Sequence, residues 1–173
     1  MGQEQAPPLP NVFISRPVES GKVMPYLLSE DPGAAMKIAA LLGPSGFGKT
    51  TLAKKICQEV GENFPGGIFW KELSENSDDL ESYAEELLGN ELNRLVVIDN
   101  LHTPEQLRPF VQSRSKLTIL VTTQVRGALK PYVPKERIVN VAKMELDQAV
   151  ELLVSSLENT AEVDLARVHL EEL

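Results

Sequence analysis

The residues from Gly43 to Thr50, Gly-Pro-Ser-Gly-Phe-Gly-Lys-Thr, limit the possible folds of this chain more than any other segment. They match the spacing G-x-x-x-x-G-K-[ST], and they lie between an apolar run at 38–42 and a helical pattern at 51–60. Gly43, Gly46 and Gly48 are expected to adopt backbone dihedrals closed to other residues, so that successive N–H groups of the loop turn inward. The N-terminus of the following helix favours negative charge. The segment therefore predicts a buried strand, an anion-binding loop and a helix in succession.

The ligand expected for this loop is a polyphosphate with its magnesium ion. Lys49 would contact the β- and γ-phosphates, the Thr50 hydroxyl would bind Mg²⁺, and Thr51 would lie beside the α-phosphate. The alternative is a glycine-rich turn that binds nothing, but every fixed position of the motif is filled. The predicted nucleotide-binding residues of the loop are Gly43, Pro44, Ser45, Gly46, Phe47, Gly48, Lys49, Thr50 and Thr51.

Composition excludes several classes of protein. The 173 residues suffice for one domain with part of a second, and 42% of them are hydrophobic, as in ordinary globular proteins. A net charge of −8 argues against a nucleic-acid or anionic-membrane surface. The single Cys57 excludes an intrachain disulfide, and neither a signal peptide nor an apolar run of transmembrane length is present, so we expect a cytoplasmic protein.

Apolar runs alternate with helical patterns along the rest of the chain. Strands are predicted at 38–42, 68–73, 95–98, 117–122 and 137–141, and helices at 23–28, 51–60, 78–88, 104–110 and from 145 onward. This alternation predicts an α/β fold, a three-layer P-loop NTPase core with a five-stranded parallel sheet plus C-terminal helices. The predicted division is an extended linker at 1–11, a nucleotide-binding domain at 12–142 and a helical segment at 143–173.

A second candidate element is Asp99, which follows the apolar run at 95–98. Ligands of open parallel sheets bind at the carboxyl ends of the strands, so Gly43, Asp99 and Thr122 should lie close together. Asp99 would then hold Mg²⁺ opposite Thr50, making Thr50 and Asp99 the metal-binding pair and Lys49 and Asp99 the catalytic pair. The alternative is an aspartate that caps a helix or turn.

Rapid ATP hydrolysis has less support in the sequence than nucleotide binding. Asn100 carries an amide and cannot act as a base, and Glu105 is either a substitute base or a solvated helix residue. After the fourth strand, Gln124 is uncharged, and Arg126 either contacts a phosphate or faces solvent. The glutamate-rich stretch at 72–86 is interpreted as a solvated helix face.

Taken with their order and spacing, these segments resemble the NB-ARC family, the nucleotide-binding switch of STAND signalling ATPases. The resemblance covers about 12–157 and implies an ADP- or ATP-binding switch in signalling, either of the immune (defense-response) or cell-death (apoptosis) type or in a regulator. It also implies adenine contacts from Ile14 and Arg16, oligomerisation, and effector and sensor domains. The matching blocks are 43–53, Phe64-Pro65-Gly66-Gly67-Ile68-Phe69-Trp70, 95–100, 118–123 and the L-x-x-x-E-A-x-x-L-L-like segment 144–153.

The chain departs from the NB-ARC pattern in three places. Asn100 stands where the family often has a second acid, and Gln124 stands where it usually has an arginine that senses the γ-phosphate. The chain also ends at Leu173, before the family's Gly-Leu-Pro-Leu motif and winged-helix histidine, so we expect a nucleotide-binding core alone. Two alternatives remain open: an ATPase of the AAA+ type or a P-loop kinase, and an interaction module with a vestigial nucleotide site.

Overall fold

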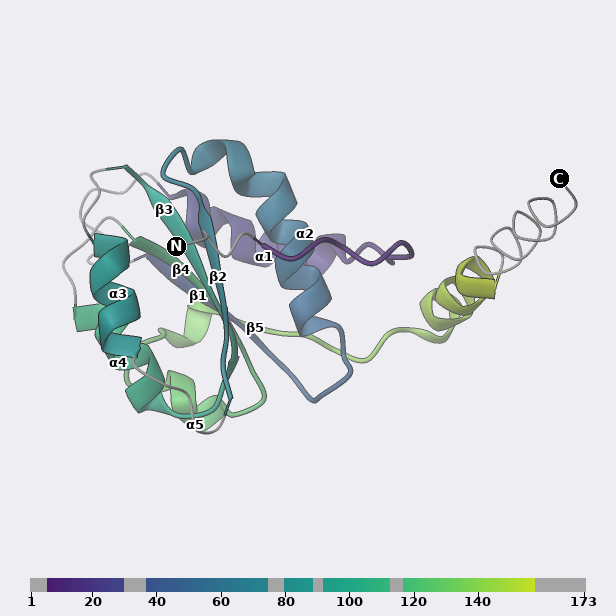
Figure 1. The fold of residues 1–173 in the computed structure, drawn as a ribbon. Helices are drawn as coiled ribbons and strands as arrows, with labels where there is room; N and C mark the ends of the chain where they lie inside the picture. The colour runs from purple at the N-terminus through teal and green to yellow at the C-terminus, as the bar shows by residue number, and fades with distance from the viewer. Residues whose placement is uncertain (1–5, 30–36, 75–79, 89–91, 113–116, 158–173) are drawn as a thin grey trace, which may run out of the picture.

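A five-stranded, wholly parallel sheet forms the centre of the molecule, in the order β2-β3-β4-β1-β5 (Figure 1). The computed structural model describes residues 6–29, 37–74, 80–88, 92–112 and 117–157. The strands are β1 (Lys37–Leu42), β2 (Ile68–Glu72), β3 (Arg94–Leu101), β4 (Leu117–Thr123) and β5 (Ile138–Asn140). The helices are α1 (Pro17–Leu28), α2 (Lys49–Val60), α3 (Leu80–Leu88), α4 (Pro104–Gln112) and α5 (Arg126–Leu129), with 3-10 turns η1 (Gly61–Asn63) and η2 (Lys135–Arg137). The predicted fold class is confirmed.

Helices cover both faces of the sheet, which gives the three layers that the sequence predicts (Figure 1). On one face α1 and α2 pack on the sheet, and on the other face α3, α4 and α5 do so. All seven residues of β4 are buried, because a central parallel strand has a helix on each side. The α1–α2 face is built on Val23, Leu27, Leu52, Ile56, Leu41, Leu95, Val97 and Leu120, and the opposite face on Ala84, Leu107, Phe110, Leu129, Ile38, Val96, Ile98 and Ile119.

The first helix is longer than predicted. The sequence indicates a helix at 23–28, whereas α1 begins at Pro17, and the backbone N–H of Ser20 donates to the carbonyl of Arg16 at 3.1 Å. Proline is well suited to the first turn of a helix, because it needs no N–H partner there and its φ is already helical. The polar first half of α1 hides this start, since only Val23 and Leu27 are buried.

The chain is again helical at 146–157, in agreement with the helix predicted from 145 onward. This helix stands apart from the sheet (Figure 1). Most of its apolar side chains are exposed, with Leu146 77% accessible. The predicted domain division stays a prediction, and the calls for 1–5 and 158–173 lie outside the described residues. Within the described ranges, none of the helices combines the length and apolar character that crossing a membrane requires.

The strand order sets the geometry of the site. Because β4 lies between β1 and β3, the loop after β1 and the aspartate of β3 are not on neighbouring strands. The carboxyl end of β4 therefore enters the space between them. Register supports this arrangement, because Leu42 pairs with Thr123 and Ile98 pairs with Val121. A shift in register between Ile98 and Leu101 follows at the end of β3.

Candidate functional site

The loop between β1 and α2 uses its glycines in two different ways. Gly46 and Gly48 have φ of 75° and 83°, in the left-handed region that side chains disfavour. Gly43 has another reason: a Cβ built there would lie 2.7 Å from the carbonyl oxygen of Val141. The expectation that all three glycines serve unusual dihedrals is therefore wrong for Gly43. That position needs glycine because the end of β1 and the residue after β5 approach each other closely.

Lys49 is the first residue of α2, and its side chain is only 8% exposed. Its ammonium donates a hydrogen bond to the carbonyl oxygen of Pro44 at 2.8 Å, so the amine lies over the loop. Burial lowers the pKa of this amine, and the nearby Asp99 carboxylate opposes that shift in part. A phosphate group in the loop would therefore favour the charged amine and gain from it.

Asp99 lies within β3, where it is 3% exposed and hydrogen-bonded to hydroxyl groups from two other elements. Thr50 Oγ1 donates to Asp99 Oδ1 at 2.9 Å, and Thr122 Oγ1 donates to the same oxygen at 2.5 Å. The backbone N–H of Asn100 donates to Thr122 Oγ1 at 2.9 Å. The structure thus brings together the ends of β3 and β4 with the start of α2, as the convergence argument expects.

A cleft of about 440 Å³ opens between the loop and the ends of β2, β3 and β4. Its lining residues are Ser45, Gly46, Gly48, Lys49, Thr50, Thr51, Glu72, Asp99, Asn100, Thr122 and Gln124. Gly43, Pro44 and Phe47 belong to the loop but not to this lining, and Phe47 packs instead on the apolar face shared with α2. The hydroxyl of Thr50 and the carboxylate of Asp99 are oxygen ligands of the kind Mg²⁺ prefers.

Two candidates from the sequence lie away from this cleft. Arg126 is exposed at the start of α5, where its Nη2 donates to Asn140 Oδ1 at 2.9 Å. Glu105 is in the first turn of α4, and hydrogen bonds from its own backbone N–H and from Thr103 lower the pKa of its carboxyl group. Neither side chain is among the residues that line the cleft. The predicted contact of Arg126 with a phosphate stays a prediction.

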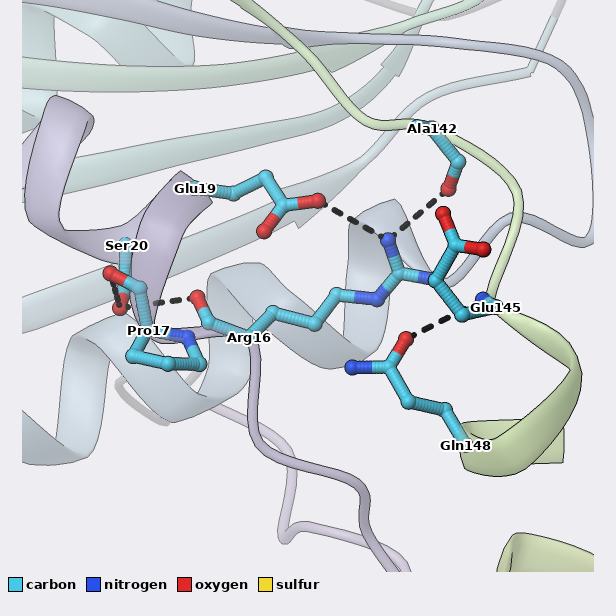
Figure 2. Close-up of polar contacts among 7 residues, drawn as sticks. All are labelled: Arg16, Pro17, Glu19, Ser20, Ala142, Glu145 and Gln148. Carbon is cyan, nitrogen blue, oxygen red and sulfur yellow. Dashed lines mark hydrogen bonds and ion pairs between the residues drawn. The ribbon is translucent and has the colours of Figure 1, made fainter. Parts of the chain in front are cut away.

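Arg16 lies at the junction of α1 with the segment after β5, as Figure 2 shows. Its guanidinium Nη1 donates to the carbonyl of Ala142 at 2.8 Å and to Glu19 Oε1 at 3.1 Å. Among the described residues its buried Nη2 has no hydrogen-bond partner. Ala142 directly follows Val141, the residue that approaches Gly43. Arg16 and the half-buried Ile14 therefore lie near the beginning of the loop, and their role at adenine stays a prediction.

Sequence reasoning missed Glu72. This residue ends β2 opposite Asp99 in the register of β2 and β3, and it lines the cleft, so its assignment to a solvated helix face is wrong. The signal was present, because Glu72 lies near the end of the predicted strand 68–73, which precedes that of Asp99 in the chain. Asn100 also lines the cleft; it has φ of 65°, and its amide donates to the carbonyl of Leu73 at 3.2 Å.

Comparisons with known proteins bear on both the fold and the family. The family model described as AAA, the ATPase family associated with various cellular activities, matches residues 39–146. Regulatory protein AfsR of Streptomyces griseus is 25% identical, and the match covers 57% of this chain and 13% of AfsR. The chain thus spans about an eighth of that relative's length.

Solved structures support the architecture. The crystal structure of Cdc6p from Pyrobaculum aerophilum aligns with a TM-score of 0.60 at 16% identity, over 85% of this chain and 50% of that one. At that identity the likeness concerns the fold alone. A structure of the HORMA:CdnC:Trip13 complex of E. coli MS115-1 aligns over 80% of this chain and 64% of that one, at 17% identity and a TM-score of 0.49, too low to carry an argument.

The family match corrects the resemblance to NB-ARC proteins. It begins within β1 and continues past β5, so it includes the phosphate loop, Asp99 and the end of β4. The defense-response and apoptosis roles that followed from the resemblance are withdrawn with it, whereas ATP or ADP binding is what the matched family implies. The chain belongs to the AAA family of ATPases, not to the NB-ARC family.

Proposed function

We propose that this chain binds ATP and ADP with Mg²⁺ in the cleft at the carboxyl edge of its sheet, and that it hydrolyses ATP there. In this proposal the loop residues 43–51 hold the phosphates and Lys49 neutralises their charge. Thr50 and Asp99 hold the metal ion. The proposal follows the activity by which the AAA family is described rather than the signalling switch first expected from the sequence.

The hydrogen bond between Thr50 Oγ1 and Asp99 Oδ1, 2.9 Å long, carries this proposal. These residues are 49 positions apart and come from α2 and β3, yet their oxygens face each other beside the ammonium of Lys49. In the described part of the chain, no three His, Cys, Asp or Glu side chains gather into a metal site. A magnesium ion here would depend on phosphate oxygens for the rest of its ligands, as Mg²⁺ in nucleotide sites commonly does.

The adenine end of the nucleotide is proposed to lie toward Ile14 and Arg16. The support is the contact of Arg16 with Ala142, because the neighbouring Val141 touches the start of the loop. An adenine bound there would lie next to the phosphate end of the cleft, across the carboxyl ends of β1 and β5. Arg126 contributes no support to this end, since its guanidinium is paired with Asn140.

Calorimetric titration of the protein with ADP and ATP, with and without Mg²⁺, tests the proposal. We expect Lys49→Ala to weaken binding at least about tenfold, because hydrogen bonds between charged groups contribute about 1.5–3 kcal/mol. Lys54→Ala is the matched control, since this lysine is on the same helix but lines a different cavity. Equal affinities of wild type and Lys49→Ala would contradict the phosphate contacts, and no binding by the folded wild type would contradict the function.

A further inference from the structure

We propose that Glu72 is the general base of ATP hydrolysis in this protein, the residue that accepts the proton of the attacking water. This inference rests on the proposed nucleotide site and adds to it a residue on β2. It gives the site a carboxylate that Asn100 does not supply.

Alternation along β2 assigns Glu72 to the face covered by α2. Trp70 is buried in the cluster that contains the apolar side chains of α2, whereas the Lys71 ammonium lies 5.3 Å from the centre of the Tyr83 ring on α3. Successive side chains of a strand point to opposite faces, so Glu72 shares the face of Trp70. On this face the N-terminus of α2 presents Lys49 and Thr50.

Asp99 belongs to the same face and is the neighbour of Glu72. Val97 packs in the cluster on the α2 face, and Ile98 packs in the cluster on the opposite face. Because side chains alternate between the two faces along β3, Asp99 lies on the α2 face. Glu72 and Asp99 are paired across β2 and β3 in parallel register. Neighbouring strands lie about 4.8 Å apart. The two carboxylates therefore stand side by side at the edge of the cleft.

The two carboxylates differ in what holds them. Asp99 is buried, and one of its oxygens accepts hydrogen bonds from Thr50 and Thr122, which suits a metal ligand. Glu72 is exposed to the cleft, and no hydrogen bond or ion pair to another described residue engages its carboxylate. A base needs an accessible lone pair that faces bound water. The exposed Glu72 carboxylate has one, whereas Asp99 is buried and one of its oxygens is engaged by two hydroxyl groups.

Other side chains near the site are poorer candidates. The Asn100 amide has no basic atom, and it already donates to the carbonyl of Leu73. Glu105 does not line the cleft and accepts hydrogen bonds within the first turn of α4. Gln124 lines the cleft as an uncharged amide. Glu72 and Asp99 are therefore the carboxylates of the lining.

The proposed step transfers the γ-phosphoryl group of ATP to water. A water oxygen attacks the γ-phosphorus as its proton passes to the Glu72 carboxylate, and the bond from that phosphorus to the oxygen bridging the β-phosphate breaks. The electron pair of that bond remains on ADP, whose charge Lys49 stabilises. The products are ADP and inorganic phosphate, and the proton leaves Glu72 for solvent.

Glu72→Gln tests this role with little change in size. The measurement is the single-turnover rate of phosphate release from ATP with Mg²⁺, together with calorimetric affinities for ATP and ADP. We expect the rate to fall about 100-fold or more, while both affinities stay within about twofold of wild type. Glu105→Gln is the matched control and should retain the wild-type rate.

The other possible outcomes distinguish a failure of this inference from a failure of the proposed function. Nucleotide binding with equal rates in wild type and Glu72→Gln would overturn the base while leaving the site intact. Binding without any hydrolysis by the wild type above the rate in water would also overturn it. A loss of affinity for ATP in Glu72→Gln that appears only with Mg²⁺ would make Glu72 a metal ligand instead. No nucleotide binding by the wild type would remove the proposed function itself.

Discussion

Replacing Gly43 by alanine should destabilise the protein, because the added methyl group has no space. Its Cβ would lie 2.7 Å from the carbonyl oxygen of Val141, a backbone atom that cannot rotate away as the end of a side chain does. An ordinary contact needs about 3.4 Å or more, so β1 and the segment after β5 must separate by roughly 0.7 Å. The overpacking alone should cost about 1–3 kcal/mol.

The hydrogen bond next to this contact adds to the expected cost. The backbone N–H of Val141 donates to the carbonyl of Leu42 at 2.8 Å, and moving Val141 away from Gly43 lengthens that bond. Losing a hydrogen bond of this kind costs about 0.5–1.5 kcal/mol. Together the two effects give roughly 1.5–4.5 kcal/mol, which for a chain of this size lowers Tm by roughly 3–18 °C.

Thermal and urea unfolding followed by circular dichroism measure this change. The matched control is Gly21→Ala, because Gly21 is inside α1 and nothing lies within 4 Å of its built Cβ. Alanine is the better helix former, so this variant should be about 0.5–1 kcal/mol more stable than wild type. Surface substitutions usually change the free energy of unfolding by no more than about 0.5 kcal/mol. A Gly43→Ala protein whose free energy of unfolding stays within this interval of wild type would refute the reasoning.

Two further predictions concern buried polar groups. Thr122→Val keeps the shape of the side chain but removes the hydroxyl that lies between Asp99 and the backbone N–H of Asn100. The free energy of unfolding, measured in urea, should therefore fall by about 1–3 kcal/mol. An unchanged value would contradict the two hydrogen bonds. Burial raises the pKa of the Cys57 thiol from 9.0 to about 12, so the folded state keeps its proton between these pH values while the unfolded state releases it. Stability should therefore fall as pH rises from about 9 to 12, by up to about 1.4 kcal/mol per pH unit, and Cys57→Ala should lack this contribution; parallel pH curves for the two proteins would disprove it.

The strands were predictable because burial on both faces leaves a continuous apolar run. Segments 38–42 and 117–122 differ from the observed β1 and β4 by one residue at an end. The order of the strands was not predictable, since each run fits equally well beside any other. The position of β4 between β1 and β3 determines that the Thr122 hydroxyl contacts Asp99. This position depends on packing between segments far apart in the sequence.

The site was predictable where a residue type is required by local chemistry. The loop and Asp99 stood out because phosphate and magnesium binding restrict the residues at fixed spacing. Glu72 was hidden by the other glutamates that follow it. The hydrogen bond of Arg126 with Asn140 could not be predicted, because Asn140 is on a strand that comes later in the chain. The register of β2 against β3, which the sequence does not reveal, places Glu72 beside Asp99 at the cleft.

The mistaken family has a similar explanation. One block that suggested it contains Gly66 and Gly67. A Cβ on Gly66 would lie 2.6 Å from the backbone oxygen of Asn93, and Gly67 has φ of 96°. These glycines serve the turn that leads into β2, a requirement of the sheet rather than of one signalling family. Short sequence motifs whose residues are required by backbone geometry therefore indicate topology more than function.

The position of β1 has a consequence for how the chain folds during synthesis. Its partners are β4 and β5, and the first of these emerges from the ribosome roughly 80 residues later, a delay of roughly 4–16 s at ordinary translation rates. Until then the apolar residues of β1 have no neighbouring strand, whereas β2 and β3 can already pair. The arrival of β4 joins the two halves and carries Thr122 to Asp99 in the same event. The nascent chain thus joins its central strands and forms the contact of Thr122 with Asp99 together, before β5 completes the sheet.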